Sequence, residues 1–157
     1  RRCILLLQNS WEHKGIRLEL ELNELQVSAN EEMMSQVWLN LIDNAVKFSR
    51  EKGRVVVNLT EIAGNAVATV RDYGMGIPEA DLPHIFDKYY QSDESRAIPG
   101  NGLGLTLAKR IVELHGGSIA VASKQNRWTE FTIRLPLAGG VPVSARAAVG
   151  NRATEGQ

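Results

Sequence analysis

Apolar and polar residues alternate along several stretches of the chain with the period of a β-strand. The segment 16–22, IRLELEL, is strictly alternating, which predicts a half-buried strand. The same pattern, bounded by Gly, Asn and Ser, predicts further strands at 25–29, 54–62, 65–71, 118–123 and 128–137. The two strands in the middle of the chain are expected to form a hairpin through Ala63-Gly64-Asn65.

Other stretches follow the longer period of a helix. Apolar residues predict one helix from 3 to about 13, ended by Gly15, and another from Gly104 that ends before Gly116-Gly117. The longest helix is predicted at 31–48, with Asn30 as its N-cap and two acidic residues in its first turn. Only short helical pieces are expected at 79–82 and 84–86.

This mixture of elements predicts an α/β (α+β) two-layer sandwich. We expect a mixed, largely antiparallel sheet, because hairpins are expected to connect its last four strands, and helices that cover one face. The segment 91–101 has almost no apolar anchor and predicts a mobile surface loop. The small, polar residues 138–157 predict a disordered tail.

Composition narrows the possible functions. The chain has 157 residues, enough for one core, and its 18 basic and 18 acidic residues balance, which disfavours nucleic acid as a partner. Cys3 is the single cysteine, so no internal disulfide can form and a reducing compartment is favoured. The sequence has no apolar run of about 18 residues and no signal peptide pattern. It opens without Met and in apparent mid-helix, which we interpret as a fragment of a longer protein.

The predicted helix 31–48 carries an unusual polar stripe. Asn40, Asn44 and Lys47 have the spacing i, i+4, i+7 and project from one side, beside an apolar stripe that includes Leu41 and Phe48. By itself this stripe fits a solvated face with two chance amides better than it fits a ligand site. An amide oxygen could hold a hydrated magnesium ion, which uses few protein ligands.

Two glycine clusters add further candidate chemistry. Asp72 ends a predicted strand and precedes Gly74 and Gly76, where backbone can approach a ligand closely; alone, this pattern also fits a plain turn. A second cluster, at the start of the last predicted helix, consists of Gly100, Gly102 and Gly104. Free backbone amides at a helix start favour phosphate, but this cluster alone also fits a flexible hinge. This G-x-G-x-G is neither a dinucleotide fingerprint nor a P-loop. Together with the polar stripe, the clusters predict a nucleotide site without a P-loop.

Four motifs in order resemble the N, G1, F and G2 boxes of sensor histidine kinases. They are Asn-x3-Asn-Ala-x-Lys-Phe from Asn40, Asp-x-Gly-x-Gly-Ile from Asp72, IFDKYY at 85–90, and Gly-x-Gly-Leu-Gly-Leu from Gly100. Such domains are the ATP-binding catalytic parts of two-component systems, in the superfamily that includes gyrase, heat-shock chaperone and mismatch-repair ATPases. The resemblance covers residues 15–137 and implies an α/β sandwich with ATP between the N-box helix and a flexible lid.

The resemblance also implies a role for each motif residue. It implies that Asn44 binds Mg²⁺, that Asn40 and Lys47 lie near the phosphates, and that Phe48 forms an apolar wall for adenine. Asp72 would accept from the adenine amino group. The remaining implied contacts are the turn beneath the base at Gly74, Gly76 and Ile77, a phosphate contact at Lys88, and the far end of the lid at Gly100, Gly102, Leu103, Gly104 and Leu105. The implied catalytic residues are Asn40, Lys47 and Lys88.

Hydrolytic members of the superfamily carry a Glu where this chain has Asn40, and an amide cannot accept a proton at neutral pH. We therefore expect transfer of the γ-phosphoryl to another acceptor. In the resembled family this is a histidine on a dimerising helical hairpin, whose phosphoryl passes to a response regulator receiver domain. His13, His84 and His115 lack the acceptor context.

Residues 1–14 are then interpreted as a linker from a missing hairpin, in a cytoplasmic domain whose parent could be membrane-anchored. The alternatives are a serine kinase of the anti-sigma factor type, an ATP-driven conformational switch, and a degenerate module that binds no nucleotide.

Overall fold

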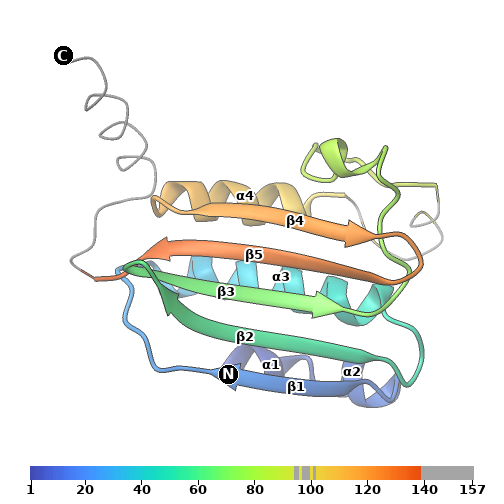
Figure 1. The fold of residues 1–157 in the computed structure, drawn as a ribbon, viewed down its shortest axis with the longest axis horizontal. Coiled ribbons are helices and arrows are strands. Elements are labelled where there is room, and N and C mark those ends of the chain that lie inside the picture. Colours follow the sequence, from blue (N-terminus) through green and yellow to red (C-terminus); the bar gives the residue numbers. More distant parts are fainter. Residues whose placement is uncertain (94–95, 97–99, 101, 139–157) are drawn as a thin grey trace.

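The computed structural model describes residues 1–93, 96, 100 and 102–138, and it shows a single sheet with the helices on one of its faces (Figure 1). The predicted two-layer sandwich is thus confirmed. Residues 139–157 of the predicted disordered tail, and residues 94–95, 97–99 and 101 of the predicted mobile loop, lie outside this description.

The sheet has five strands in the order β1-β2-β3-β5-β4. The strands are β1 (Arg17–Leu22), β2 (Arg54–Ile62), β3 (Asn65–Asp72), β4 (Ser118–Lys124) and β5 (Trp128–Pro136). β1 pairs with β2 in parallel, and every other pair is antiparallel. This arrangement confirms the prediction of a mixed, largely antiparallel sheet, and it brings the C-terminal end of β3 beside the start of β5.

The connections between the last four strands differ from the prediction. Hairpins join β2 to β3 and β4 to β5, but β3 leads to β4 through a 3₁₀ turn, η1 (Leu82–His84), and the helix α4 (Gly104–Leu114). β4 lies at the sheet edge, with β5 between it and β3. The prediction of hairpins throughout was wrong because strand order depends on which long-range pairing buries most apolar surface, and alternation alone does not specify the partner.

The N-terminal segment forms two short helices, α1 (Arg2–Leu6) and α2 (Gln8–His13), where one helix was predicted. Leu7 leaves the helical conformation, with φ −98° and ψ 10°, and the Trp11 indole N–H donates to the Ile4 carbonyl across the break. The break lets Leu7 and Trp11 pack against the core that also buries Ile4. Tertiary packing therefore overrides the continuous helical period.

Two other local predictions were wrong in detail. Segment 25–29 forms a single bridge, Val27 to Leu137, in place of a strand. The helical pieces expected at 79–82 and 84–86 are replaced by the one turn of η1, in which Pro83 occupies an early position.

The helix α3 (Glu31–Phe48) is the main element of the covering layer. Asn30 caps it as predicted, since the Asn30 side chain accepts a 2.9 Å hydrogen bond from the Met33 N–H. Its predicted apolar stripe is buried, with Val37 and Leu41 no more than 1% exposed. α3 packs on β3 and α4, so the polar stripe beside it faces the region between α3 and the start of α4. Within the described residues, no helix combines the length and apolar content needed to cross a membrane.

Candidate functional site

A cavity of about 230 Å³ lies among the C-terminal half of α3, the end of β3, the start of β5 and the start of α4. Its walls include eleven of the fourteen residues singled out in the sequence: Asn40, Asn44, Lys47, Phe48, Asp72, Gly76, Ile77, Gly100, Gly102, Gly104 and Leu105. Side chains from three motifs far apart in the chain thus share one cavity.

Three of the predicted residues do not line this cavity. Gly74 lies behind the wall, where a Cβ atom would stand 1.9 Å from the Phe48 carbonyl oxygen. Lys88 is exposed, with its Nζ 5.4 Å from the centre of the Tyr89 ring. Leu103 precedes α4 as its N-cap residue. The geometry therefore assigns Gly74 a packing role and leaves a phosphate contact by Lys88 as a prediction.

The polar stripe of α3 connects two sides of the cavity. The Asn40 side-chain amide donates a 3.2 Å hydrogen bond to the Gly104 carbonyl, which ties α3 to the first residue of α4. Lys47 Nζ lies 2.8 Å from a carboxylate oxygen of Asp43, one turn earlier on the same face. Asn44, between them on the helix, also lines the cavity. The stripe is therefore a wall of the cavity rather than a solvated face.

Asp72 is the buried ionisable group of the cavity wall, with 4% of its surface exposed. Its Oδ1 accepts a 3.0 Å hydrogen bond from the Gly74 N–H, and among the described residues no donor bonds to Oδ2. Burial raises the pKa of Asp72 to about 7, against the opposing effects of the Gly74 bond and the positive charge of Lys14. Asp72 can therefore accept a hydrogen bond from a ligand, and does so most strongly when it is ionised.

The turn after Asp72 is shaped by close backbone packing. Met75 N–H donates to the Phe48 carbonyl, so the turn is fixed to the end of α3. Gly76 has φ +65°, and a Cβ there would lie 2.2 Å from the Lys124 carbonyl oxygen, so a side chain would both strain the backbone and collide with β4. Ile77 N–H then donates to the Ser123 hydroxyl on the same strand. Gly74 and Gly76 therefore let the turn at the floor of the cavity pack closely against the end of α3 and against β4.

The N-terminus of α4 forms another part of the cavity wall. Gly102, with φ +70°, passes so close to Tyr89 that a Cβ would lie 2.7 Å from its carbonyl carbon. Among the described residues no side chain caps the first amides of α4, and Gly102, Gly104 and Leu105 line the cavity there. Uncapped amides at the positive end of a helix dipole favour an anion. The cavity wall therefore offers both a carboxylate and backbone donors.

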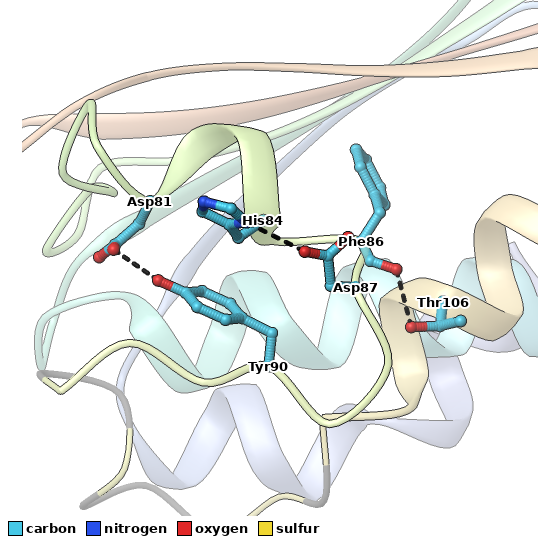
Figure 2. Close-up of polar contacts among 6 residues, drawn as sticks. All are labelled: Asp81, His84, Phe86, Asp87, Tyr90 and Thr106. Carbon is cyan, nitrogen blue, oxygen red and sulfur yellow. Dashed lines mark hydrogen bonds and ion pairs between the residues drawn. The ribbon is translucent and has the colours of Figure 1, made fainter.

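The segment between η1 and α4 is fastened by polar contacts that the sequence does not reveal (Figure 2). The Tyr90 hydroxyl donates to a carboxylate oxygen of Asp81, and both residues line the cavity. The Thr106 hydroxyl on α4 donates to the Phe86 carbonyl at 2.9 Å. The Phe86 ring in turn packs edge-on to Phe131 of β5, at 6.2 Å between ring centres. Phe86 is thus held to α4 and β5, and Tyr90 to Asp81.

Nine further residues line the cavity that were not among the predicted site residues: Asp43, Met75, Asp81, Ile85, Tyr90, Gln91, Ser92, Thr129 and Phe131. A signal existed for Asp43, which lies three residues after Asn40 and four before Lys47 on the same helical face. Thr129 and Phe131 alternate on the helix-facing side of β5, but only the pairing of β5 with β3 brings them beside Asp72. Met75, Ile85 and Tyr90 belong to the motifs at 72–77 and 85–90, so the sequence also held a signal for them. The contact of Asp81, Gln91 and Ser92 with the cavity depends on the path of an irregular segment.

Two of the three histidines have structural contacts. His115 Nε2 accepts from the Asn30 N–H at 3.0 Å, and its Nδ1 lies 2.7 Å from the Ile111 carbonyl, which requires a proton on Nδ1. The Nδ1 of His84 lies 3.0 Å from a carboxylate oxygen of Asp87. Neither histidine lines the cavity.

The donor set of the cavity suits a magnesium nucleotide. Over the described part of the chain, no group of three His, Cys, Asp or Glu side chains could enclose a metal ion. Mg²⁺ usually keeps several waters and takes few protein oxygens, so a site with the Asn44 amide and substrate phosphates fits these residues. The cavity also has apolar walls, which include Met75 and Ile77.

Comparison with known proteins extends this picture. The model of the family described as histidine kinase-, DNA gyrase B-, and HSP90-like ATPase matches residues 29–139. The signal transduction histidine-protein kinase ArlS of Staphylococcus epidermidis is 40% identical over 116 residues, or 72% of this chain. The chain spans 25% of the length of that relative.

Solved structures agree with the sequence matches. The mycobacterial sensor histidine kinase MprB superposes with a TM-score of 0.75 at 31% identity, covering 90% of this chain and 93% of that one. Full-length ShkA in complex with AMPPNP superposes with a TM-score of 0.78 at 28% identity, covering 91% of this chain and 30% of that one. The chain therefore belongs to the histidine kinase-, DNA gyrase B-, and HSP90-like ATPase family, and within it to the catalytic domains of the histidine kinases.

Proposed function

We propose that the domain, residues 15–137, binds Mg-ATP in this cavity and transfers the γ-phosphoryl to a histidine on a separate dimerisation hairpin, for relay to a response regulator receiver domain. The observation that supports the proposal most is the pairing, within one cavity, of a buried carboxylate at Asp72 with the N-terminal end of the helix α4. A nucleotide needs a hydrogen-bond acceptor for its base at one end and donors for its phosphates at the other. The AMPPNP complex of ShkA supports the same class of ligand.

Each wall of the cavity has a role in this proposal. Asp72 accepts from the adenine amino group, and Phe48 and Ile77 supply apolar contacts to the base. The amides of Gly102 and Gly104 donate to the phosphates, and Lys47 exchanges part of its contact with Asp43 for a phosphate oxygen. Asn44 and the phosphates would hold Mg²⁺, which would neutralise part of the phosphate charge.

Asn40 favours phosphoryl transfer over hydrolysis. Its side-chain amide is engaged with the Gly104 carbonyl, and an amide does not accept a proton at neutral pH. Slow attack by water then preserves the γ-phosphoryl for a protein acceptor.

The test is radiolabelling with γ-labelled ATP. The domain alone is expected to bind ATP and to label itself negligibly, and addition of the parent's histidine hairpin is expected to label the hairpin. Tethering that hairpin ahead of Arg1 is expected to increase the rate through effective concentration. The label is expected to be acid-labile and alkali-stable. An alkali-labile phosphoserine on a partner would establish the serine kinase alternative, and rapid steady-state hydrolysis would establish the conformational switch.

A further inference from the structure

Lys14, between α2 and β1, reaches the C-terminal end of α3. Its Nζ donates hydrogen bonds of 2.8 Å to the Val46 carbonyl and 2.7 Å to the Lys47 carbonyl. The last carbonyls of a helix lack partners within the helix and form the negative end of its dipole. The ammonium group of Lys14 therefore bonds two of these carbonyls, and its positive charge lies at the favourable end of α3.

The turn of α3 that Lys14 holds is the turn that enters the cavity. The next carbonyl, that of Phe48, accepts a 3.1 Å hydrogen bond from the Met75 N–H in the turn after Asp72. Three consecutive carbonyls thus bond first to Lys14 and then to the Asp72 turn. The backbone of Lys14 is fixed as well, because its carbonyl accepts from the Lys52 N–H at 2.9 Å. A change in the position of Lys14 would therefore be transmitted to the floor of the cavity.

Charge connects the same two residues. The positive charge of Lys14 lowers the pKa of Asp72, although burial has the larger, opposite effect. Burial lowers the pKa of Lys14, and the charges of Glu51 and Asp72 raise it. The other ionisable groups of the cavity are already engaged with partners: Asp43 with Lys47, and Asp81 with Tyr90. Within the described residues, Lys14 is the cation whose charge acts on Asp72.

We propose that Lys14 is a positioning residue for the nucleotide site, which holds the last turn of α3 against the Asp72 turn and places a positive charge near the Asp72 carboxylate. This inference rests on the proposed binding of ATP. It makes the segment before β1, outside the four motifs and outside residues 15–137, part of what determines adenine binding. Any displacement of α2 from α3 would weaken the acceptor for the base.

The experiment compares Lys14→Met and Lys14→Gln with the wild-type 157-residue chain. Lys14→Gln keeps a hydrogen-bond donor without the charge, so it carries the test if Lys14→Met does not fold. Lys52→Met is the matched control, because it removes an equal charge from the adjacent loop, and Lys14→Arg is the conservative variant. The first measurement is the ¹³C NMR titration of the Asp72 carboxyl in ATP-free protein, assigned with Asp72→Asn. The second is the affinity for a fluorescent ATP analogue across pH 5.5 to 8.5.

We expect the Asp72 midpoint to rise by about one pH unit in Lys14→Met and Lys14→Gln, because a neighbouring positive charge is lost. At pH 7 this change lowers the ionised fraction, and with it ATP affinity, by about fivefold. Lys52→Met should have the Asp72 midpoint and the ATP affinity of the wild type, and Lys14→Arg should come close to the wild type in both.

A variant that only unfolds at lower temperature, with an unchanged Asp72 titration and unchanged affinity in its folded state, would overturn the inference and leave Lys14 a helix cap. Failure of the wild-type chain to bind ATP would instead overturn the proposed function, and the titration in ATP-free protein would still measure the effect of Lys14 on Asp72.

Discussion

Replacing Asp72 with Asn should change the dependence of stability on pH in a defined direction. Asp72 is 4% exposed, and its pKa is raised from 3.8 to about 7 in the folded domain. At pH values between the unfolded pKa of 3.8 and the folded pKa of about 7, the folded state binds more protons than the unfolded state. The free energy of unfolding therefore falls as pH rises. The shift of about 3 units corresponds to about 4 kcal/mol, present as stability below pH 4 and lost as pH rises through 7.

The assay is urea unfolding of the wild type and of Asp72→Asn at pH 5 and at pH 8. The Asn side chain can still accept from the Gly74 N–H, but it does not ionise. About two units of the pKa shift lie between pH 5 and pH 7. When the pH is raised from 5 to 8, the free energy of unfolding of the wild type should therefore fall by about 3 kcal/mol relative to that of Asp72→Asn. Other groups titrate equally in both proteins and cancel. If the free energies of unfolding of the two proteins differ by the same amount at pH 5 and at pH 8, the reasoning is refuted.

Three further outcomes are expected. Asn44→Ala should abolish the dependence of ATP affinity on Mg²⁺ in nucleotide titrations, whereas Asn44→Asp should retain part of it because a carboxylate also binds Mg²⁺. Gly74→Ala should destabilise the domain by about 3 kcal/mol or more in urea unfolding, since its Cβ would lie 1.9 Å from the Phe48 carbonyl oxygen. His115→Ala should lower the free energy of unfolding by about 1–2 kcal/mol through loss of its bonds to Asn30 and Ile111, with ATP affinity unchanged.

Each of these predictions has a contrary result. An Asn44→Ala domain that keeps its full response to Mg²⁺ would exclude that side chain as the ligand. Wild-type stability of Gly74→Ala would show that the α3 end can retreat from the turn. A loss of ATP affinity in His115→Ala, at unchanged stability, would place the histidine in the functional machinery rather than in the packing between α3 and α4.

The sequence by itself determined the local elements and the chemistry of the cavity. The N-cap at Asn30 and the buried stripe of Val37 and Leu41 follow from helical period and from capping chemistry, which act over a few residues. The spacing of Asn40, Asn44 and Lys47 likewise fixed one helical face, so the candidate polar wall could be named without a fold.

Tertiary structure decided what depends on contacts between distant segments. Only the insertion of β5 between β3 and β4 brings Thr129 and Phe131 beside Asp72, because strand alternation does not specify a partner. The break at Leu7 occurs because packing of the segment on the core outweighs a continuous helical period. The contact of Lys14 with the carbonyls of α3, 32 and 33 residues away, has no local pattern at all. A lysine side chain is long enough to reach many positions, and only the folded arrangement of α2 against α3 selects this one.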